Sequence, residues 1–161
     1  MSSWELFITN LKIKLFAWWT IPLLAISGAK IIALDKKSVK VRIRHWWLTK
    51  NHIGGIYLGT QAIGADITGG ALVLNAMNEA DKKVSVAFKS MQCEFLKRPE
   101  ADMIFTCNDG EAIDQMMDET FKTGERINKE VTVLGTCPKL SDEIVSKFVL
   151  VLSVKYRKRS A

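Results

Sequence analysis

The spacing of apolar residues at the start of the chain predicts a helix. Large apolar side chains recur every three or four residues, and a helix places residues at this spacing on one face. Glu5 stands three residues after Ser2, which is the spacing of a capping box at a helix start. The residue before a proline is pushed out of the helical region, so we expect this helix to end before Pro22. The residues of the repeat are Trp4, Ile8, Leu11, Leu15 and Trp18.

Strands with one buried and one wet face are predicted by alternation of apolar and polar residues with a period of two. This alternation occurs at 39–43 and, in two phases, at 84–95, and further strands are expected at 30–34, 103–107, 128–137 and 144–156. Within 84–95 the apolar phase changes between Phe88 and Met91, which indicates a β-bulge. A second helix is expected at 111–122, ended by Thr123-Gly124.

Residues 54–77 carry one charged residue, Asp66, and are rich in glycine. The segment is too long for a strand and does not alternate, so we predict a helix that is surrounded on most sides. Strands packed around one buried helix make an α+β domain. We therefore expect a single domain over 1–161, with an N-terminal helical extension at 1–28 and a basic tail at 157–161.

Composition adds a basic balance, with a formal net charge of +6 over 161 residues, which suits an anionic partner. The three cysteines form no CxxC pair, so neither a metal site nor a disulfide framework is expected, and a cytoplasmic location is the simplest interpretation. No phosphate-binding or dinucleotide-binding fingerprint appears, and we expect no cofactor.

The stretch without charged residues in the N-terminal segment is too short for a membrane-spanning helix, and the segment lacks the features of a signal peptide. It either packs on the domain or makes peripheral contact with a membrane. In the second case Trp4, Trp18 and Trp19 would lie at lipid headgroups, with Lys12 and Lys14 on anionic lipid.

Candidate chemistry gathers between Asn51 and Asp66. Positions 55, 59, 62, 66 and 70 fall on one face of the predicted helix and are Gly, Gly, Ala, Asp and Gly. A carboxylate on a face of small residues suits a groove for a thin substrate, although a structural Asp66 remains open. Gly54 and Gly55 either leave helix-start amides free for an oxyanion or only permit a tight turn. Asn51 could orient water or a carbonyl, and His52 is either an acid–base group or structural.

The stretch NHIGGIYLGTQAIGAD, from Asn51 to Asp66, resembles the core motif of hotdog-fold thioesterases related to those of the phenylacetic-acid pathway. With EFLKRPEAD and FTCNDG, it is also similar to a bacterial group that carries a domain of unknown function (DUF4442-like) in the same superfamily. Asn51, Gly59 and Asp66 match the motif. Tyr57-Leu58 stands where the motif has His-Gly.

The resemblance implies a hotdog fold, with an antiparallel sheet around a long central helix, and a homodimer or homotetramer with its site at the interface. It also implies an acyl-CoA or acyl-carrier thioesterase with Asp66 as nucleophile or general base and Asn51 positioning water or carbonyl. Gly54, Gly55, Gly59, His52 and Tyr57 are the expected substrate-binding residues.

Two other functions stay in view. The missing motif histidine favours a non-catalytic acyl-CoA or fatty-acyl binding protein. Nucleic-acid binding would use the basic and aromatic residues of 42–50, but arginines that alternate with apolar residues are ordinary on an exposed strand. We therefore expect no nucleic-acid partner.

Overall fold

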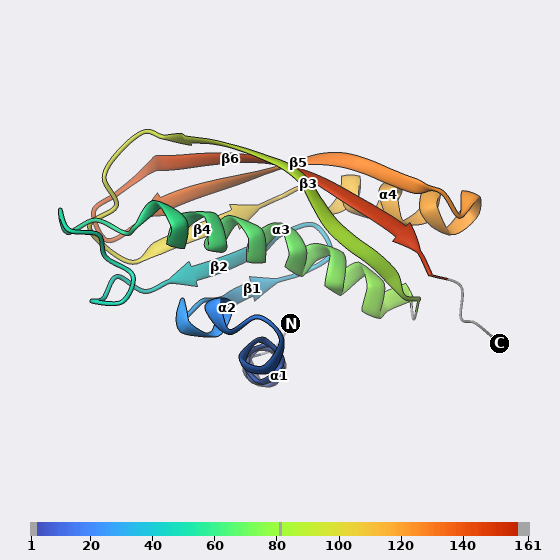
Figure 1. The fold of residues 1–161 in the computed structure, drawn as a ribbon, viewed down its shortest axis with the longest axis horizontal. Coiled ribbons are helices and arrows are strands. Elements are labelled where there is room, and N and C mark those ends of the chain that lie inside the picture. The colour runs from blue at the N-terminus through green and yellow to red at the C-terminus, as the bar shows by residue number, and fades with distance from the viewer. Residues whose placement is uncertain (1–2, 81, 158–161) are drawn as a thin grey trace.

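The computed structural model describes residues 3–80 and 82–157 and contains the expected order of elements (Figure 1). Ser2 and the end of the basic tail, 158–161, lie outside the described residues. The elements are α1 (Ser3–Thr20), α2 (Pro22–Ile26), β1 (Lys30–Leu34), β2 (Val39–Ile43), α3 (Leu58–Ala80), β3 (Val84–Phe95), β4 (Met103–Cys107), α4 (Gly110–Thr123), β5 (Arg126–Cys137) and β6 (Ser141–Tyr156).

The strands form one antiparallel six-stranded sheet in the order β1-β2-β4-β5-β6-β3, and Figure 1 shows α3 running along its concave side. Alternate residues of the inner strands face this helix and are fully buried, among them Val41, Phe105, Val133 and Leu150. In β2, β4 and the second half of β5 the alternation separates the core from the outer face, whereas β3 is exposed on both faces from Lys89 to Phe95.

Glycines in α3 let the sheet approach the helix closely. A Cβ added at Gly64 would lie 2.5–2.8 Å from three ring atoms of Phe105, which no relaxed structure allows. At Gly69 an added Cβ would lie 3.1 Å from Leu150. The groups that approach α3 at these two glycines are side chains of the sheet.

The predicted start of the central helix was wrong by four residues, since α3 begins at Leu58 and not at Gly54. The backbone before Leu58 is held in other pairings: the Ile56 amide donates to the Pro99 carbonyl at 2.9 Å, and the Tyr57 amide donates to the Thr49 carbonyl at 2.8 Å. Gly54 also has a positive φ of 90°, which is outside the right-handed helical region. The two glycines therefore shape a turn.

The strand β3 carries the predicted bulge, because its register against β6 shifts between Phe88 and Ser90. It lies at the end of the sheet order, so its second edge has no strand partner among residues 3–80 and 82–157. Edges of this length are seldom left bare in native proteins, since they pair readily with another chain.

The side chain of Asn10 joins the N-terminal helix α1 to β1, and Leu6 of the same helix packs against the core. The Asn10 side-chain amide donates to the Ile31 carbonyl and accepts from the Ile31 amide, both at 2.8 Å. Asn10 thus replaces a neighbouring strand at this sheet edge. The helix ends before Pro22, as predicted, and the short helix α2 begins at that proline. None of the helices within the described residues is both long enough and apolar enough to cross a bilayer.

Candidate functional site

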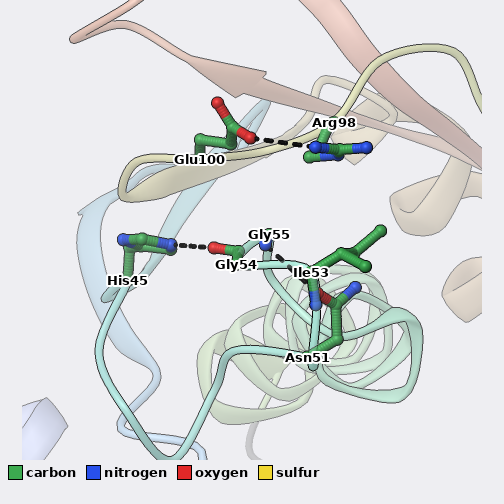
Figure 2. Close-up of polar contacts among 7 residues, drawn as sticks. All are labelled: His45, Asn51, Ile53, Gly54, Gly55, Arg98 and Glu100. Carbon is green, nitrogen blue, oxygen red and sulfur yellow. Dashed lines mark hydrogen bonds and ion pairs between the residues drawn. The ribbon is translucent and has the colours of Figure 1, made fainter.

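Asn51 builds the turn that precedes α3. Its side-chain oxygen accepts hydrogen bonds from the amides of Ile53 and Gly55, each at 3.1 Å (Figure 2). Its backbone amide donates to the Gly55 carbonyl at 2.8 Å, and the Gly54 amide donates to the Asn51 carbonyl at 3.1 Å. The side-chain oxygen is therefore committed to the turn, whereas the side-chain NH₂ has no partner within the described part of the chain. Asn51 keeps a free donor, not a free acceptor.

This geometry corrects the interpretation of Gly54 and Gly55 as helix-start glycines. Both of their amides donate to Asn51, and so neither is aimed at a ligand. Since α3 begins at Leu58, its first-turn amides belong to Leu58, Gly59 and Thr60. These amides lie at the positive end of the helix dipole and are the groups that suit a developing oxyanion.

Two histidines lie near the turn and differ in their surroundings. His52 is exposed, and its ring makes no hydrogen bond to any residue that the structure describes. The His45 ring lies with Nε2 2.7 Å from the Gly54 carbonyl, and because a carbonyl only accepts, Nε2 carries the proton (Figure 2). The His45 amide also donates to Asp102 Oδ1 at 3.0 Å. His45 therefore holds the turn in place, a role that no local sequence signal indicated.

Tyr57 and Gly59 form one unit at the helix start. A Cβ added at Gly59 would lie 2.7 Å from Cε1 of Tyr57, so the ring folds back over the glycine. The ring is about half exposed. Tyr57, which departs from the thioesterase motif, thus lies against Gly59, which matches the motif. Both residues are at the start of α3, beside its first-turn amides.

Asp66 lies further along the same helix. Eight residues separate it from Leu58, which places it about 12 Å along the axis at 1.5 Å per residue. Burial raises the pKa of Asp66 above the ordinary value of 3.8. The structure records no hydrogen bond or ion pair to its carboxylate from any described residue. Its neighbours one turn away are Ala62 and Gly70, so the predicted stripe of small residues is present from position 59 onward.

The sequence pattern of one protein family, described as a domain of unknown function (DUF4442), matches residues 11–139. This is most of the chain and includes both Asn51 and Asp66. The chain belongs to the DUF4442 family. No curated protein matches it.

Solved structures similar to this DUF4442 protein share its fold along nearly the whole chain. A Pseudomonas aeruginosa protein described as of unknown function and as a probable thioesterase is 21% identical, with a TM-score of 0.75 over 91% of this chain and 96% of that one. A thioesterase from Haemophilus influenzae is 11% identical, with a TM-score of 0.68 over 97% and 94%. These likenesses confirm the hotdog fold.

A third neighbour is a thioesterase from Staphylococcus aureus in which a glutamine is replaced by alanine. It is 11% identical, with a TM-score of 0.63 over 83% of this chain and 98% of that one. A second variant of the same protein replaces a glutamate fifteen positions later, with a TM-score of 0.61 and 11% identity over 84% and 99%.

Three basic residues that could bind an anionic partner have partners within the DUF4442 protein. Lys97 forms an ion pair with Glu143, and Arg98 forms one with Glu100 at 3.4 Å. The stem of Arg98 also covers the turn, since a Cβ added at Gly55 would lie 2.9 Å from its Cγ. Arg126 donates to the Ser153 hydroxyl at 3.1 Å. Of these three, Arg98 is the one that lies beside the candidate site.

Exposed apolar side chains gather on the segment that leads into α3, and Trp47 is the most exposed of them at 73%. They belong to residues 47–58, the segment that contains the turn and the helix start. Such a cluster suits an acyl chain or a protein surface. The cluster comprises Trp47, Leu48, Ile53, Tyr57 and Leu58. A shallow hollow of about 180 Å³ elsewhere, on β3 and β6, contains none of the candidate residues.

Proposed function

We propose that this DUF4442 protein hydrolyses acyl-CoA or acyl-carrier thioesters, with Asp66 as the general base. The supporting observation is the half-buried carboxylate of Asp66, whose pKa burial raises and which has no hydrogen-bond or ion-pair partner among the described residues. The helix that carries it begins directly after the turn built by Asn51, so its first-turn amides and the Asn51 side chain belong to neighbouring segments of the chain. A base of raised pKa is better matched to removing a proton from water near neutral pH.

In the proposed reaction, water attacks the thioester carbonyl carbon while Asp66 takes one of its protons. The negative charge that develops on the carbonyl oxygen is met by the first-turn amides of α3 and by the free NH₂ of Asn51. The carbon–sulfur bond then breaks, and the proton held by Asp66 passes to the leaving thiolate. The products are a free acid and a thiol, and no other reactant is needed.

The spacing of the groups supports a site shared between two copies. About 9–12 Å of helix separates Asp66 from the first-turn amides of its own chain, which is too far for both to touch one thioester group. The outward face of α3 is apolar apart from Asp66, with Ile63 and Ile67 half-buried and Leu74 exposed. Phe88 of the edge strand β3 lies beside this face, against Gly70. We propose that a second copy covers both, so that Asp66 of one copy serves the helix start of the other.

The Staphylococcus aureus variants support the choice of residues. In that thioesterase the two replaced amide and carboxylate residues are fifteen positions apart, which is also the separation of Asn51 and Asp66. An amide donor followed fifteen residues later by a carboxylate is thus common to both chains.

The test uses thiol release from a panel of acyl-CoAs, from acetyl to palmitoyl plus phenylacetyl. Asp66→Asn removes the base and keeps the shape. Asn51→Asp keeps the oxygen that accepts from Ile53 and Gly55 but removes the NH₂ donor. Asp114→Asn is the matched control, because Asp114 on α4 also has a pKa raised first by burial. We expect turnover to fall at least about a hundredfold in the two site variants, in line with the loss of one oxyanion donor or one base, and to persist in the control.

A mixing experiment tests the shared site. In a dimer built from Asp66→Asn and Asn51→Asp chains, one of the two sites has both groups intact. Random assembly makes about half of the dimers mixed, so about a quarter of wild-type activity should return. No recovery in proven mixed dimers would refute the shared site while leaving hydrolysis intact.

The alternative is acyl-CoA binding without turnover, which the replacement of the motif histidine by Tyr57-Leu58 favours. It predicts that no thioester in the panel is cleaved, that palmitoyl-CoA raises the melting temperature, and that Asp66→Asn keeps this shift.

A further inference from the structure

The two N-terminal helices present a second, larger apolar surface away from the candidate site. Six large apolar side chains of α1 are exposed, and Trp19 is the most exposed of them at 86%. Three more follow, one just before α2 and two within it. Figure 1 shows α1 at the β1 edge of the sheet, on the periphery of the molecule. We call this the N-terminal apolar surface: Trp4, Phe7, Leu11, Leu15, Trp18, Trp19, Ile21, Leu23 and Ile26.

The docking of α1 turns this surface outward. At 100° per residue, the six exposed apolar residues of α1 lie within about 60° of the direction of Trp4. Asn10, which holds Ile31, lies about 120° from that direction and faces the sheet. A helix fixed through Asn10 therefore cannot bury its tryptophans against its own domain.

Positive charge borders the apolar stripe on both sides. By the same rotation, Lys12 and Lys14 lie about 80° to either side of Trp4, and both are exposed. The only acidic residue of α1 is Glu5 in its first turn, and Lys30 follows α2. An apolar stripe that contains tryptophans and is bordered by lysines is typical of a helix that lies flat in the lipid headgroup region. Lysine stems bury along the stripe while their charges reach lipid phosphates.

We propose that the N-terminal apolar surface binds an anionic lipid bilayer, with α1 lying in the plane of the membrane. The stripe enters the boundary between headgroups and acyl chains, and Lys12 and Lys14 bind lipid phosphates. The charge on both margins favours lipid over a second copy of this chain, because a like-charged copy would bring the same lysines together. The sheet and α3 then stand on the water side, with the candidate site close to a source of acyl groups.

The test is co-sedimentation of the full-length protein with vesicles of phosphatidylcholine alone or with phosphatidylglycerol added. We expect binding to the anionic vesicles that weakens as salt rises. Leu15→Ser should weaken it about tenfold, the loss of one inserted leucine. Leu140→Ser is the matched control, because Leu140 is 59% exposed and Leu15 is 58% exposed, and Leu140 lies on the loop between β5 and β6. It should leave binding unchanged.

The charge contribution is tested separately. Lys12→Glu with Lys14→Glu should weaken binding to anionic vesicles at least about tenfold, at about 1 kcal/mol per lysine near such a surface. Lys122→Glu with Lys147→Glu changes the net charge equally and should have a much smaller effect. If the two double variants lost vesicle binding equally, the proposal that Lys12 and Lys14 contact the lipid phosphates would be refuted.

Two further results would overturn the proposal. One is the absence of sedimentation with either vesicle. The other is an assembly in solution that Leu15→Ser dissociates without any vesicle binding, which would make the surface an interface between copies. Quenching of tryptophan fluorescence by lipids brominated near the headgroup gives the orientation, and it should fall when Trp18 and Trp19 are replaced by Phe.

Discussion

Replacing Asp66 by Asn should stabilise the protein at neutral pH while it removes the proposed base. Burial raises the pKa of Asp66 above 3.8, so the charged form is less favourable in the folded chain than in the unfolded chain. The carboxylate has no ion-pair or hydrogen-bond partner in the described residues that offsets this burial. An amide of the same shape carries no charge, and the variant therefore avoids the desolvation of a carboxylate.

The sign of the pH dependence follows from proton linkage. Between 3.8 and the raised pKa, the folded chain binds more protons at position 66 than the unfolded chain does. The contribution of Asp66 to the free energy of unfolding therefore falls as pH rises through this window, and it stays low above the raised pKa. At acid pH, where Asp66 is protonated in both states, the variant and the parent should be equally stable.

The expected gain at pH 7 is about 0.5–1 kcal/mol, the lower part of the range for stabilising changes, because the carboxylate keeps part of its surface in water. For a domain of this size it corresponds to about 1–4 °C in melting temperature. The measurements are thermal unfolding and urea unfolding followed by circular dichroism, from pH 4 to pH 8. Asp114→Asn is again the control, because Asp114 is more exposed and should change stability less.

Two results would refute this reasoning. If Asp66→Asn lowered the free energy of unfolding by 1 kcal/mol or more at pH 7, the carboxylate would have a stabilising partner, and a structural role would replace the catalytic one. If the stability difference between parent and variant were the same at pH 4 and pH 8, burial of a titrating carboxylate could not be its cause.

The remaining predictions concern packing and docking. Gly64→Ala should lower the free energy of unfolding by about 1–3 kcal/mol, because its Cβ would overlap the buried phenyl ring of β4. Gly70→Ala, which meets only an ordinary contact at 3.9 Å, should raise it by up to about 1 kcal/mol, and urea unfolding curves that shift equally would contradict this. Asn10→Ala should speed amide exchange in α1 and β1, which hydrogen exchange would detect, since it removes both bonds to the sheet edge. Iodoacetamide at pH 8 should modify exposed Cys93 but not Cys107, whose pKa burial raises to about 11, and mass spectrometry of peptides would show any exception.

Much of the fold could be predicted because β2, β4 and β5 show their buried face in their own sequence. The alternation in 39–43 and the change of phase after Phe88 are local signals, and β2 and the bulge of β3 lie where they predicted. The sequence also indicated the α4 end, since Gly124 adopts the left-handed conformation with φ 75°.

The start of α3 could not be predicted in the same way, because distant segments determine it. Gly54 and Gly55 have the composition of a helix-start turn, but the bonds from Ile56 to Pro99 and from Tyr57 to Thr49 delay the helix until Leu58. The position of a turn that is closed by a residue more than forty positions away carries no local signal. The same holds for His45, whose ring reaches Gly54 through the fold.

The central helix also explains why its sequence could not indicate which face meets the core. Gly64, Ala65 and Thr68 are buried on the sheet side, whereas Asp66 lies about 160° around the helix from both Gly64 and Thr68 and is half-buried. Small or apolar residues occupy both faces, so the helix lacks the polar side that a surface helix shows. One face is covered by the sheet of the same chain. The other bears a single carboxylate and is left apolar, which is the composition expected of a surface that a second copy completes. The lack of a polar face on α3 therefore has two consequences. It prevents the sequence from indicating which face meets the core, and it supports a site shared with a second copy.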